Sequence, residues 1–389
     1  MNILVFAHDA FLYGASQSLL TALKGIRKKA DRNILVLLPF GGVYEKELID
    51  AEINYKIIPF PRCVDFNYAT ASRLKRIQNQ YSYYLNRISI LKELIKTAKD
   101  FEADVIYTNT SVVSIGYTIA KKINVPHVWH IREFGDLGFG FKYYPNREKI
   151  AKLVNKSTKS IFVSEILKKH WCAKNSIRQS VVYNGIVASN KFTANLFKTF
   201  PIQNFKIGMI GAVSPGKEQH LAIEAFAELI KVIPNCELYF YGGVNQNYYK
   251  SLLKLIGAFQ LEAKVIFQPF TKDKNQIYEN LDLVISCTKL EAFGRTIVEA
   301  MDYGIPVIAN SAGGVLEIID NNLNGLLYNG TAEGLKNEMV KVLTDKNLYE
   351  SLSLNGLRKA KFFGVETYVN SIDTILYEAS INKNKFENK

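Results

Sequence analysis

The sequence predicts an α/β protein made of two doubly wound, Rossmann-like domains that face a central cleft. Its 389 residues are too many for one ordinary core and suit two domains, at roughly 100–200 residues each. Short apolar runs alternate with segments of helical spacing in both halves, a pattern typical of βα units and parallel sheets. A polar stretch near residues 184–204 separates the halves, so we expect domains at 1–185 and 186–366.

In the first half, the apolar runs are interpreted as buried strands of a parallel sheet. Segments of helical spacing lie between them, for example Ser16–Lys28 and Ile88–Lys99. The expected strands are "MNILVFAHDA" at 1–10, "NILVLLPF" at 33–40, "DVIYTNT" at 104–110, "HVWHI" at 127–131 and "SIFVS" at 160–164.

The second half repeats the alternation. In open sheets of this kind, ligands bind beyond the carboxyl ends of the strands, so the loops that follow each strand are the places to search for chemistry. The expected strands are "KIGMIGAV" at 206–213, "CELYFYGG" at 236–243, "KVIFQPF" at 264–270, "LDLVISC" at 281–287 and "IPVIANS" at 305–311.

Composition narrows the class of protein. We find no run of about 18 uncharged apolar residues and no basic-then-apolar leader, so a soluble, unsecreted protein is expected. The four cysteines, Cys63, Cys172, Cys236 and Cys287, form no CxxC pair. Neither a zinc site nor a disulfide framework is indicated, and a reducing cytoplasm fits best.

The formal charge of +13 is unevenly distributed. Residues 1–190 contain 28 Lys and Arg against 15 Asp and Glu, whereas residues 191–389 contain 21 of each kind. The asymmetry indicates that the first domain faces an anionic partner, such as a membrane surface or nucleic acid. The alternative is that the lysines are scattered for solubility.

One basic segment, "RLKRIQNQYSYYLNRISILKELIKTAKD" at 73–100, interleaves cations with apolar residues at helical spacing. Such a helix is suited to an anionic lipid surface. The alternative is that the apolar stripe packs on the sheet and the cations are solvated. No nucleic-acid-binding motif accompanies the charge, so no nucleic-acid partner is expected. The segment combines Arg73, Lys75, Arg76, Arg87, Lys92, Lys96 and Lys99 with Leu74, Ile77, Tyr81, Tyr84, Leu85, Ile88 and Leu91.

The stretch "EAFGRTIVEA" places Glu291 and Glu299 on either side of a glycine. Gly294 is expected at the start of a helix that runs from about Arg295, where backbone N–H groups attract a phosphate. Carboxylates repel phosphate, so they suit hydroxyl groups of a ribose and a hexose, and the combination implies a nucleotide sugar. Alternatively, Glu291 is a solvated loop residue and Glu299 pairs with Arg295 at i, i+4.

The longer stretch "EAFGRTIVEAMDYGIPVIANSAGGVLEII" resembles the E-x7-E segment of the retaining glycosyltransferases of family 4, which have GT-B architecture. "VVYNGI" at 181–186 and "IGMIGAVSPGKEQHLAIEAFAEL" at 207–229 resemble further elements of that family, in order along the chain. The resemblance implies that Glu291 contacts the donor sugar, Glu299 the ribose and Lys217 the diphosphate. The donor site expected from these two loops also includes Gly211, Phe293, Gly294 and Arg295.

Lys217 also makes physical sense, since an ammonium after a strand and a glycine-containing loop can neutralise a departing nucleoside diphosphate. The alternative is a surface lysine. Ala212 departs from the family, many of whose members have an arginine there. The chain contains no D-x-D pair, so we expect a reaction that needs no metal and no cofactor beyond a UDP- or GDP-linked sugar.

The first half resembles the family more loosely. In "HDAFLYGASQSLLTAL", Gly14 is expected to bring backbone close to the phosphate and the sugar; the alternative is an ordinary strand-to-helix turn. His130 lies near the end of the run "HVWHI", at a position where the family often carries a histidine that lines the sugar site; the alternative is a structural histidine. Arg132, Glu133 and His127 are weaker candidates. The predicted catalytic set is therefore Glu291, Lys217 and His130.

Together these observations imply a GT-B glycosyltransferase. Residues 1–185 are expected to bind the acceptor and residues 186–366 the nucleotide sugar, with a last helix near 367–389 crossing back to the first domain, as in that architecture. The expected reaction transfers a sugar with retention of configuration to a hydroxyl acceptor. The expected acceptor is a lipid-linked glycan of capsule, exopolysaccharide or O-antigen synthesis, at the cytoplasmic face of the cell membrane.

Two other classes stay open from the sequence. A nucleotide-sugar epimerase has the same two-domain cleft but needs no acceptor. A non-catalytic partner protein of the same fold is disfavoured because Lys217, Glu291, Gly294 and Glu299 are all present. A hydride-transferring dinucleotide enzyme is disfavoured because no G-x-G-x-x-G follows the first strand.

Overall fold

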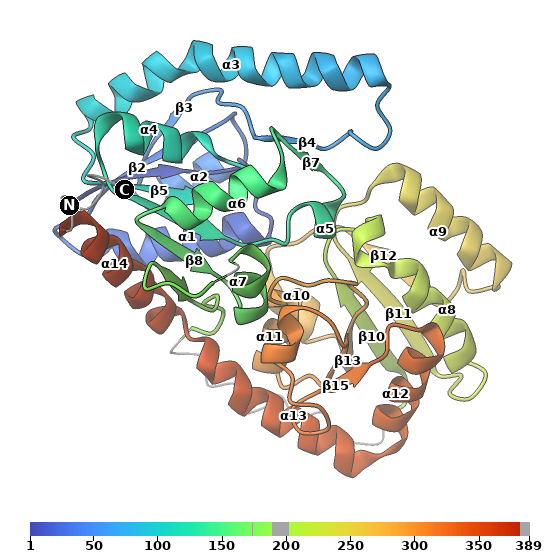
Figure 1. The fold of residues 1–389 in the computed structure, drawn as a ribbon. Helices are drawn as coiled ribbons and strands as arrows, with labels where there is room; N and C mark the ends of the chain where they lie inside the picture. The colour runs from blue at the N-terminus through green and yellow to red at the C-terminus, as the bar shows by residue number, and fades with distance from the viewer. Residues whose placement is uncertain (173, 189–201, 382–389) are drawn as a thin grey trace. The chain divides into compact units, whose positions relative to one another are not determined.

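A computed structural model describes residues 1–172, 174–188 and 202–381 (Figure 1). The chain divides into two compact units: unit 1 is Met1–Gly185 with Val365–Lys389, and unit 2 is Ile186–Gly364. Most of the connecting stretch expected near residues 184–204 lies outside the described residues.

Unit 1 contains a seven-stranded sheet in which every neighbouring pair is parallel. The parallel order confirms the expected α/β class and puts the carboxyl ends of all strands at one edge. From edge to edge the strands are β3 (Asn54–Ile57), β2 (Asn33–Leu38), β1 (Asn2–Phe6), β5 (Val105–Asn109), β6 (His127–Ile131), β8 (Lys159–Phe162) and β9 (Gln179–Val181).

Helices connect these strands, and a small antiparallel pair, β4 (Val64–Asp65) with β7 (Lys142–Tyr143), lies apart from the main sheet. The helices of unit 1 are α1 (Gly14–Arg27), α2 (Tyr44–Ile49), α3 (Arg73–Asp100), α4 (Ile115–Ile123), α5 (Asp136–Phe139), α6 (Arg147–Lys156), α7 (Glu165–Trp171) and α14 (Val365–Ile381).

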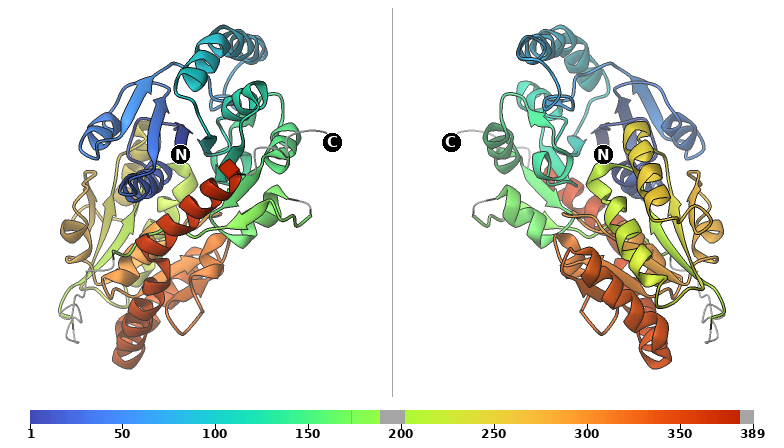
Figure 2. Two further views of the ribbon diagram at one scale, coloured as in Figure 1. Left: turned by 90° about the vertical axis from the view of Figure 1, so that its left-hand side faces the viewer. Right: turned by 90° about the vertical axis from the view of Figure 1, so that its right-hand side faces the viewer.

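The last helix, α14, belongs to unit 1 although it follows unit 2 in sequence. It lies beside α1 in both views of Figure 2, and apolar residues of both helices join one core cluster with β1 and β2. The Tyr368 hydroxyl donates to the backbone oxygen of Ser18 at 3.0 Å, and Asp373 accepts hydrogen bonds from Arg32 and Lys29. Apolar burial and ionic contacts together therefore hold α14 on this unit.

Helix α3 runs along the outer side of unit 1 (Figures 1 and 2). It begins where the Ser72 hydroxyl accepts a hydrogen bond from the Lys75 backbone N–H, a typical N-cap. Only Tyr83, Leu94, Thr97 and Ala98 are buried along its 28 residues. The sequence predicted a helix over 73–100 from this spacing, and the structure has a helix with these bounds.

Unit 2 contains a six-stranded sheet that is also entirely parallel. All five strands expected in this half are present, and the short edge strand β15 was not foreseen. The order is β12 (Val265–Gln268), β11 (Cys236–Tyr241), β10 (Phe205–Ile210), β13 (Leu283–Ser286), β14 (Val307–Asn310) and β15 (Leu326–Tyr328).

The core of unit 2 joins the strands to apolar faces of α8, α9, α12 and α13. None of the described helices of the chain is long and apolar enough to cross a membrane. The helical elements of unit 2 are η1 (Pro215–Lys217), α8 (Gln219–Leu229), α9 (Gln246–Ala258), α10 (Lys274–Tyr278), α11 (Arg295–Asp302), η2 (Gly314–Glu317), α12 (Ala332–Thr344), α13 (Lys346–Ala360) and η3 (Lys361–Phe363).

Candidate functional site

In unit 2, the loop after β10 presents Lys217. Gly211 has φ +142°, a backbone conformation that residues with a side chain rarely adopt, so glycine suits the start of this loop. Gln219 fixes the loop, because its Nε2 donates to the Ala212 oxygen at 3.0 Å and its Oε1 accepts from the Ser214 N–H at 3.3 Å. Nothing in the sequence distinguished Gln219 from an ordinary helix residue.

The loop after β13 presents Glu291. Its backbone oxygen accepts a hydrogen bond from the Gly314 N–H at 2.6 Å, and a Cβ on Gly313 would lie 2.3 Å from the same oxygen. Glycines are therefore required where this second loop packs against Glu291. The carboxylate Oε2 lies 2.8 Å from Nζ of Lys217, and both side chains are partly exposed. The structure thus brings together the two residues that the sequence proposed for the donor sugar and the diphosphate.

Gly294 directly precedes α11, as expected. Its φ of +109° lies in the left-handed region, which other residues adopt only with strain. The first N–H groups of α11 and its macrodipole provide the anion-attracting end that the sequence predicted. Phe293, in contrast, is 3% exposed and packs edge-on against Phe363, with ring centroids 5.5 Å apart. Its ring contributes to the core of unit 2.

Glu299 lies on α11 in a buried cluster of partners. Its carboxylate accepts from the Tyr278 hydroxyl at 2.9 Å, lies 3.0 Å from Nζ of Lys274 and 3.3 Å from Nη2 of Arg295. Burial opposes ionisation, but Arg295, Lys274 and Tyr278 outweigh it and lower the pKa of Glu299. The i, i+4 pair that the sequence offered as an alternative is therefore present, so a donor ribose would have to share this carboxylate.

In unit 1, His130 is the next-to-last residue of β6 and is fully buried. Nη2 of Arg132 lies 3.2 Å from its Nδ1, and the Tyr107 hydroxyl lies 2.7 Å from the same nitrogen. A guanidinium can only donate, so Nδ1 accepts and the ring proton is on Nε2. That Nε2 is buried and has no hydrogen-bond partner among the described residues. An unmet buried donor is costly, so the atom is suited to a hydroxyl of a ligand.

The imidazole of His130 is also held neutral. Burial, and then the charge of Arg132, lowers its pKa well below the usual 6.5. The side chain is therefore a fixed hydrogen-bond donor and not a proton-transfer group near neutral pH. His8, which follows β1, is similar: burial and Arg132 lower its pKa to about 3, and its Nδ1 lies 3.1 Å from the Asn109 amide.

Arg132 itself is buried and donates hydrogen bonds to several side chains. It donates to the side-chain oxygens of Asn109 at 2.6 Å and Asn184 at 2.7 Å, and to the Tyr368 hydroxyl at 2.9 Å. These contacts and the one to His130 occupy its guanidinium, so its geometry fits a positioning role. Neither Asn184 nor Tyr368 was singled out as a partner from the sequence, because they lie 52 and 236 residues away.

The remaining candidates of unit 1 are Glu133, His127 and Gly14. Glu133 is buried, and its carboxylate accepts from the backbone N–H groups of Ser111 and Arg132. His127 is a core residue whose ring nitrogens meet Thr108 at 2.8 Å and Ser157 at 3.0 Å. Gly14 is the first residue of α1, so it stands at a strand-to-helix turn, and its approach to a donor phosphate stays a prediction.

The chain is similar to known glycosyltransferases. Residues 194–359 match the family model described as glycosyl transferases group 1. The Staphylococcus aureus capsular polysaccharide biosynthesis glycosyltransferase CapM is 24% identical over 57% of this chain and 62% of that protein. Protein CapJ of the same species is 25% identical over 70% and 71%. The chain thus spans less than two thirds of CapM, and only 11–12% of the plant sucrose-phosphate synthases that it also matches.

Solved structures agree with this assignment. Anabaena HepE, crystallised with UDP and glucose, has a TM-score of 0.79 and 26% identity over 97% of this chain and 99% of that one. The predicted GT-B fold and the predicted glycosyltransferase class are confirmed by these matches. The chain carries a glycosyltransferase group 1 domain of the GT-B type.

Proposed function

We propose that the protein is a retaining glycosyltransferase of family 4 that moves a sugar from a UDP- or GDP-linked donor to a hydroxyl acceptor. The observation that carries the proposal is the meeting of Lys217 and Glu291 at 2.8 Å, beside the glycine-led start of α11, at the carboxyl edge of the second sheet. These groups lie within the residues that match the group 1 family model.

In the proposed reaction, unit 2 binds the nucleotide sugar. Lys217 and the first N–H groups of α11 stabilise the charge that develops on the leaving diphosphate. Glu291 accepts hydrogen bonds from sugar hydroxyls, and Glu299 accepts them from the ribose. The acceptor hydroxyl attacks on the face from which the diphosphate leaves and passes its proton to the departing phosphate. The absence of a D-x-D pair favours a reaction without metal.

The relatives suggest an acceptor class. CapM is named for capsular polysaccharide biosynthesis, and we propose that this chain likewise extends a glycan, held on a lipid carrier and bound by unit 1. His130, with its fixed Nε2–H, is proposed to donate to a substrate hydroxyl.

A location at the cytoplasmic face of the membrane is proposed from α3. The alternative, that its apolar stripe packs on the sheet, does not fit, because the stripe is exposed: Leu74 is 81% exposed, Tyr81 66% and Ile88 69%. Residues three or four apart share a helix face, and the same face continues toward Lys92 and Lys96. Exposed apolar residues followed by lysines are what an anionic lipid surface attracts.

Four cations of this helix have other contacts. On the helix itself, Lys75 donates to Gln78 at 3.2 Å and Lys96 pairs with Asp100. Arg87 points inward and donates to Ser114 and to the Tyr83 hydroxyl, both at 2.8 Å. Arg76 lies over the ring of Tyr68, 4.4 Å from its centroid. Of the seven cations that the sequence offered to lipid, Arg76 and Arg87 therefore contact residues outside the helix, and Lys75 and Lys96 have exposed partners on it.

The experiment that tests the proposed function is incubation with a panel of nucleotide sugars, with release of nucleoside diphosphate as the readout. We expect one donor to release diphosphate, faster when a glycan acceptor is added. Isomerisation of the donor without release would indicate the epimerase alternative, and no turnover of any donor would indicate a non-catalytic protein.

A further inference from the structure

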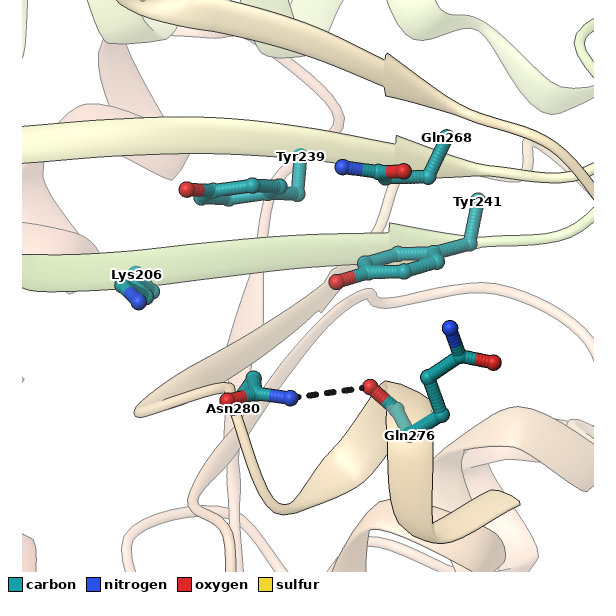
Figure 3. Close-up of a pocket in the computed structure, with 6 residues that line it drawn as sticks. All are labelled: Lys206, Tyr239, Tyr241, Gln268, Gln276 and Asn280. Carbon is teal, nitrogen blue, oxygen red and sulfur yellow. Dashed lines mark hydrogen bonds between the residues drawn. The ribbon is translucent and has the colours of Figure 1, made fainter. Parts of the chain in front are cut away.

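A pocket of about 200 Å³ lies on one face of the second sheet (Figure 3). Lys206, near the amino end of β10, forms part of its lining. At roughly 3.3 Å per residue, the five residues from Lys206 to Gly211 span about 16 Å. The pocket therefore extends along the sheet face: Lys206 marks the end far from the Lys217 loop, and Tyr241 and Gln268, the last residues of β11 and β12, mark the end at the carboxyl edge. Its lining residues are Lys206, Tyr239, Tyr241, Gln268, Gln276 and Asn280.

Two tyrosines form the aromatic part of this pocket. Tyr239 and Tyr241 are two residues apart on β11, so they project from the same face. Their rings are nearly parallel, at 21°, with centroids 6.2 Å apart, and Figure 3 shows them side by side along the strand. The Tyr239 hydroxyl is fixed by donation to Glu237 at 2.8 Å. The face of an aromatic ring carries partial negative charge and attracts the partly positive C–H face of a sugar ring.

Neutral amides surround the rings. The Asn280 side-chain N–H donates to the Gln276 backbone oxygen at 3.1 Å, which leaves its side-chain oxygen as an acceptor. Oε1 of Gln276 accepts from the Thr271 hydroxyl at 3.1 Å, which leaves its amino group as a donor. Gln268 provides both kinds of group. Sugar hydroxyls donate and accept at once, so a mixed set of this kind suits them, and none of the six lining side chains is acidic.

We propose that this pocket binds one pyranose ring of a glycan chain, as a carbohydrate site separate from the donor site. Its volume is below the roughly 300–1,000 Å³ of pockets for drug-sized ligands, so a single ring is the matching size. A nucleotide fits the pocket less well, because Lys206 is the single cation in the lining to meet its phosphates. This proposal rests on the proposed function in one respect: it assumes that the acceptor of the enzyme is a glycan.

The test measures binding of di- and trisaccharides of glucose, galactose and N-acetylglucosamine to the whole protein, by saturation-transfer NMR and calorimetry. We expect at least one to bind, and Tyr241→Ala to weaken it by roughly tenfold, about the worth of one aromatic contact. Tyr241→Phe keeps the ring and should bind nearly as well. Gln276→Ala changes an exposed residue, so it should keep the fold and still weaken binding severalfold.

Lys217→Met separates this proposal from the proposed function. That variant should bind the oligosaccharide as the wild type does, while losing release of nucleoside diphosphate. If glycans bind through Tyr241 but no donor is turned over, the pocket proposal stands and the proposed function fails. The pocket proposal is overturned if no oligosaccharide binds, if Tyr241→Ala and Gln276→Ala both bind as well as wild type, or if uridine occupies the pocket instead.

Discussion

Lys217 and Glu291 form an ion pair of 2.8 Å between two loops of unit 2. Their side chains are 33% and 22% exposed, and pairs with this exposure typically contribute about 0–1 kcal/mol to stability. A diphosphate can therefore compete for the lysine at small cost. The ion pair positions the two loops, and it is weak enough for Lys217 to exchange Glu291 for a diphosphate when the donor binds.

The first prediction concerns the ammonium group. Lys217→Met should lower kcat/KM by about 10²-fold, because an electrostatic stabiliser of a leaving group is typically worth a few kcal/mol in the transition state. Its midpoint of chemical unfolding should hardly change, since the ion pair is partly exposed. Lys254→Met, at an exposed position on α9, is the matched control and should behave as wild type. Equal activity of the two variants would show that Lys217 has no role in the donor site.

The two glutamates should respond differently to amide substitution. If Glu291 holds the sugar through the transition state, Glu291→Gln should lower kcat, whereas loss of a ribose contact in Glu299→Gln should chiefly raise KM for the donor. Steady-state kinetics over donor concentration separate the two parameters. If kcat and KM were unchanged in both variants, the two glutamates would have purely structural roles.

Glu299 should also make unit 2 sensitive to acid. Its folded pKa lies below its ordinary 4.5, so its stabilising contribution is present above about pH 4.5 and is lost as the pH falls through the folded value. In Glu299→Gln, the free energy of unfolding should be lower at neutral pH, by roughly 1–3 kcal/mol for an unmet buried group, and should depend less on acid. Denaturant melts at several pH values measure this, and parallel curves for the two proteins would contradict it.

His130 should act as a hydrogen-bond donor without titrating. Because its pKa lies well below 6.5, kcat/KM should show no limb near pH 6.5 that arises from this residue. His130→Gln retains a side-chain N–H and should keep more activity than His130→Phe, which has none. A limb near pH 6.5 in the wild type that vanishes in His130→Gln would show that the imidazole exchanges a proton after all.

The lipid proposal predicts salt-sensitive binding to anionic vesicles. Each engaged Lys or Arg contributes about 1 kcal/mol near such a surface, and salt weakens the attraction over the Debye length of roughly 10 Å at 0.1 M. Co-sedimentation should require anionic lipid and decline at high salt. Serine substitution of exposed residues should reduce it, in one variant at Ile77, Tyr81 and Ile88 and in another at Lys92, Lys96 and Lys99.

A control for that experiment changes exposed lysines on α9 of unit 2, Lys250 and Lys254, to serine. These substitutions lower the net charge but leave α3 intact, so vesicle binding should stay close to that of the wild type. Equal sedimentation with neutral and anionic vesicles, or none with either, would show that unit 1 is basic for another reason.

Much of the fold was accessible from the sequence because buried parallel strands appear as apolar runs. The runs around Ile3, Val36 and Ile285 are of this kind, and each became a central strand. The strands of the two parallel sheets that were missed, β3, β9 and β15, are three or four residues long and lie at sheet edges, so they carry little apolar signal. The two-residue strands β4 and β7 were missed as well. The position of Gly294 before α11 was predicted correctly, because a glycine followed by good helix formers indicates the start of a helix.

The partners of the candidate residues were not accessible in the same way. Lys274 and Tyr278 meet Glu299 from a separate helix, and Tyr368 reaches Arg132 from the far end of the chain. Such contacts depend on tertiary packing and leave no periodic pattern in the sequence. The outward orientation of the apolar stripe on α3 was likewise open, because a stripe at helical spacing looks the same whether it packs on a sheet or faces solvent.

The measurement that tests the central claim most directly is the configuration of the product. With a donor that releases nucleoside diphosphate and a glycan acceptor, proton NMR of the earliest product reports the anomeric centre before it can equilibrate. The account predicts one new glycosidic bond per diphosphate released, with the same anomeric configuration as the donor, and loss of both signals in Lys217→Met. A product of inverted configuration would contradict the retaining mechanism, and an isomerised donor with no new glycosidic bond would contradict glycosyl transfer itself.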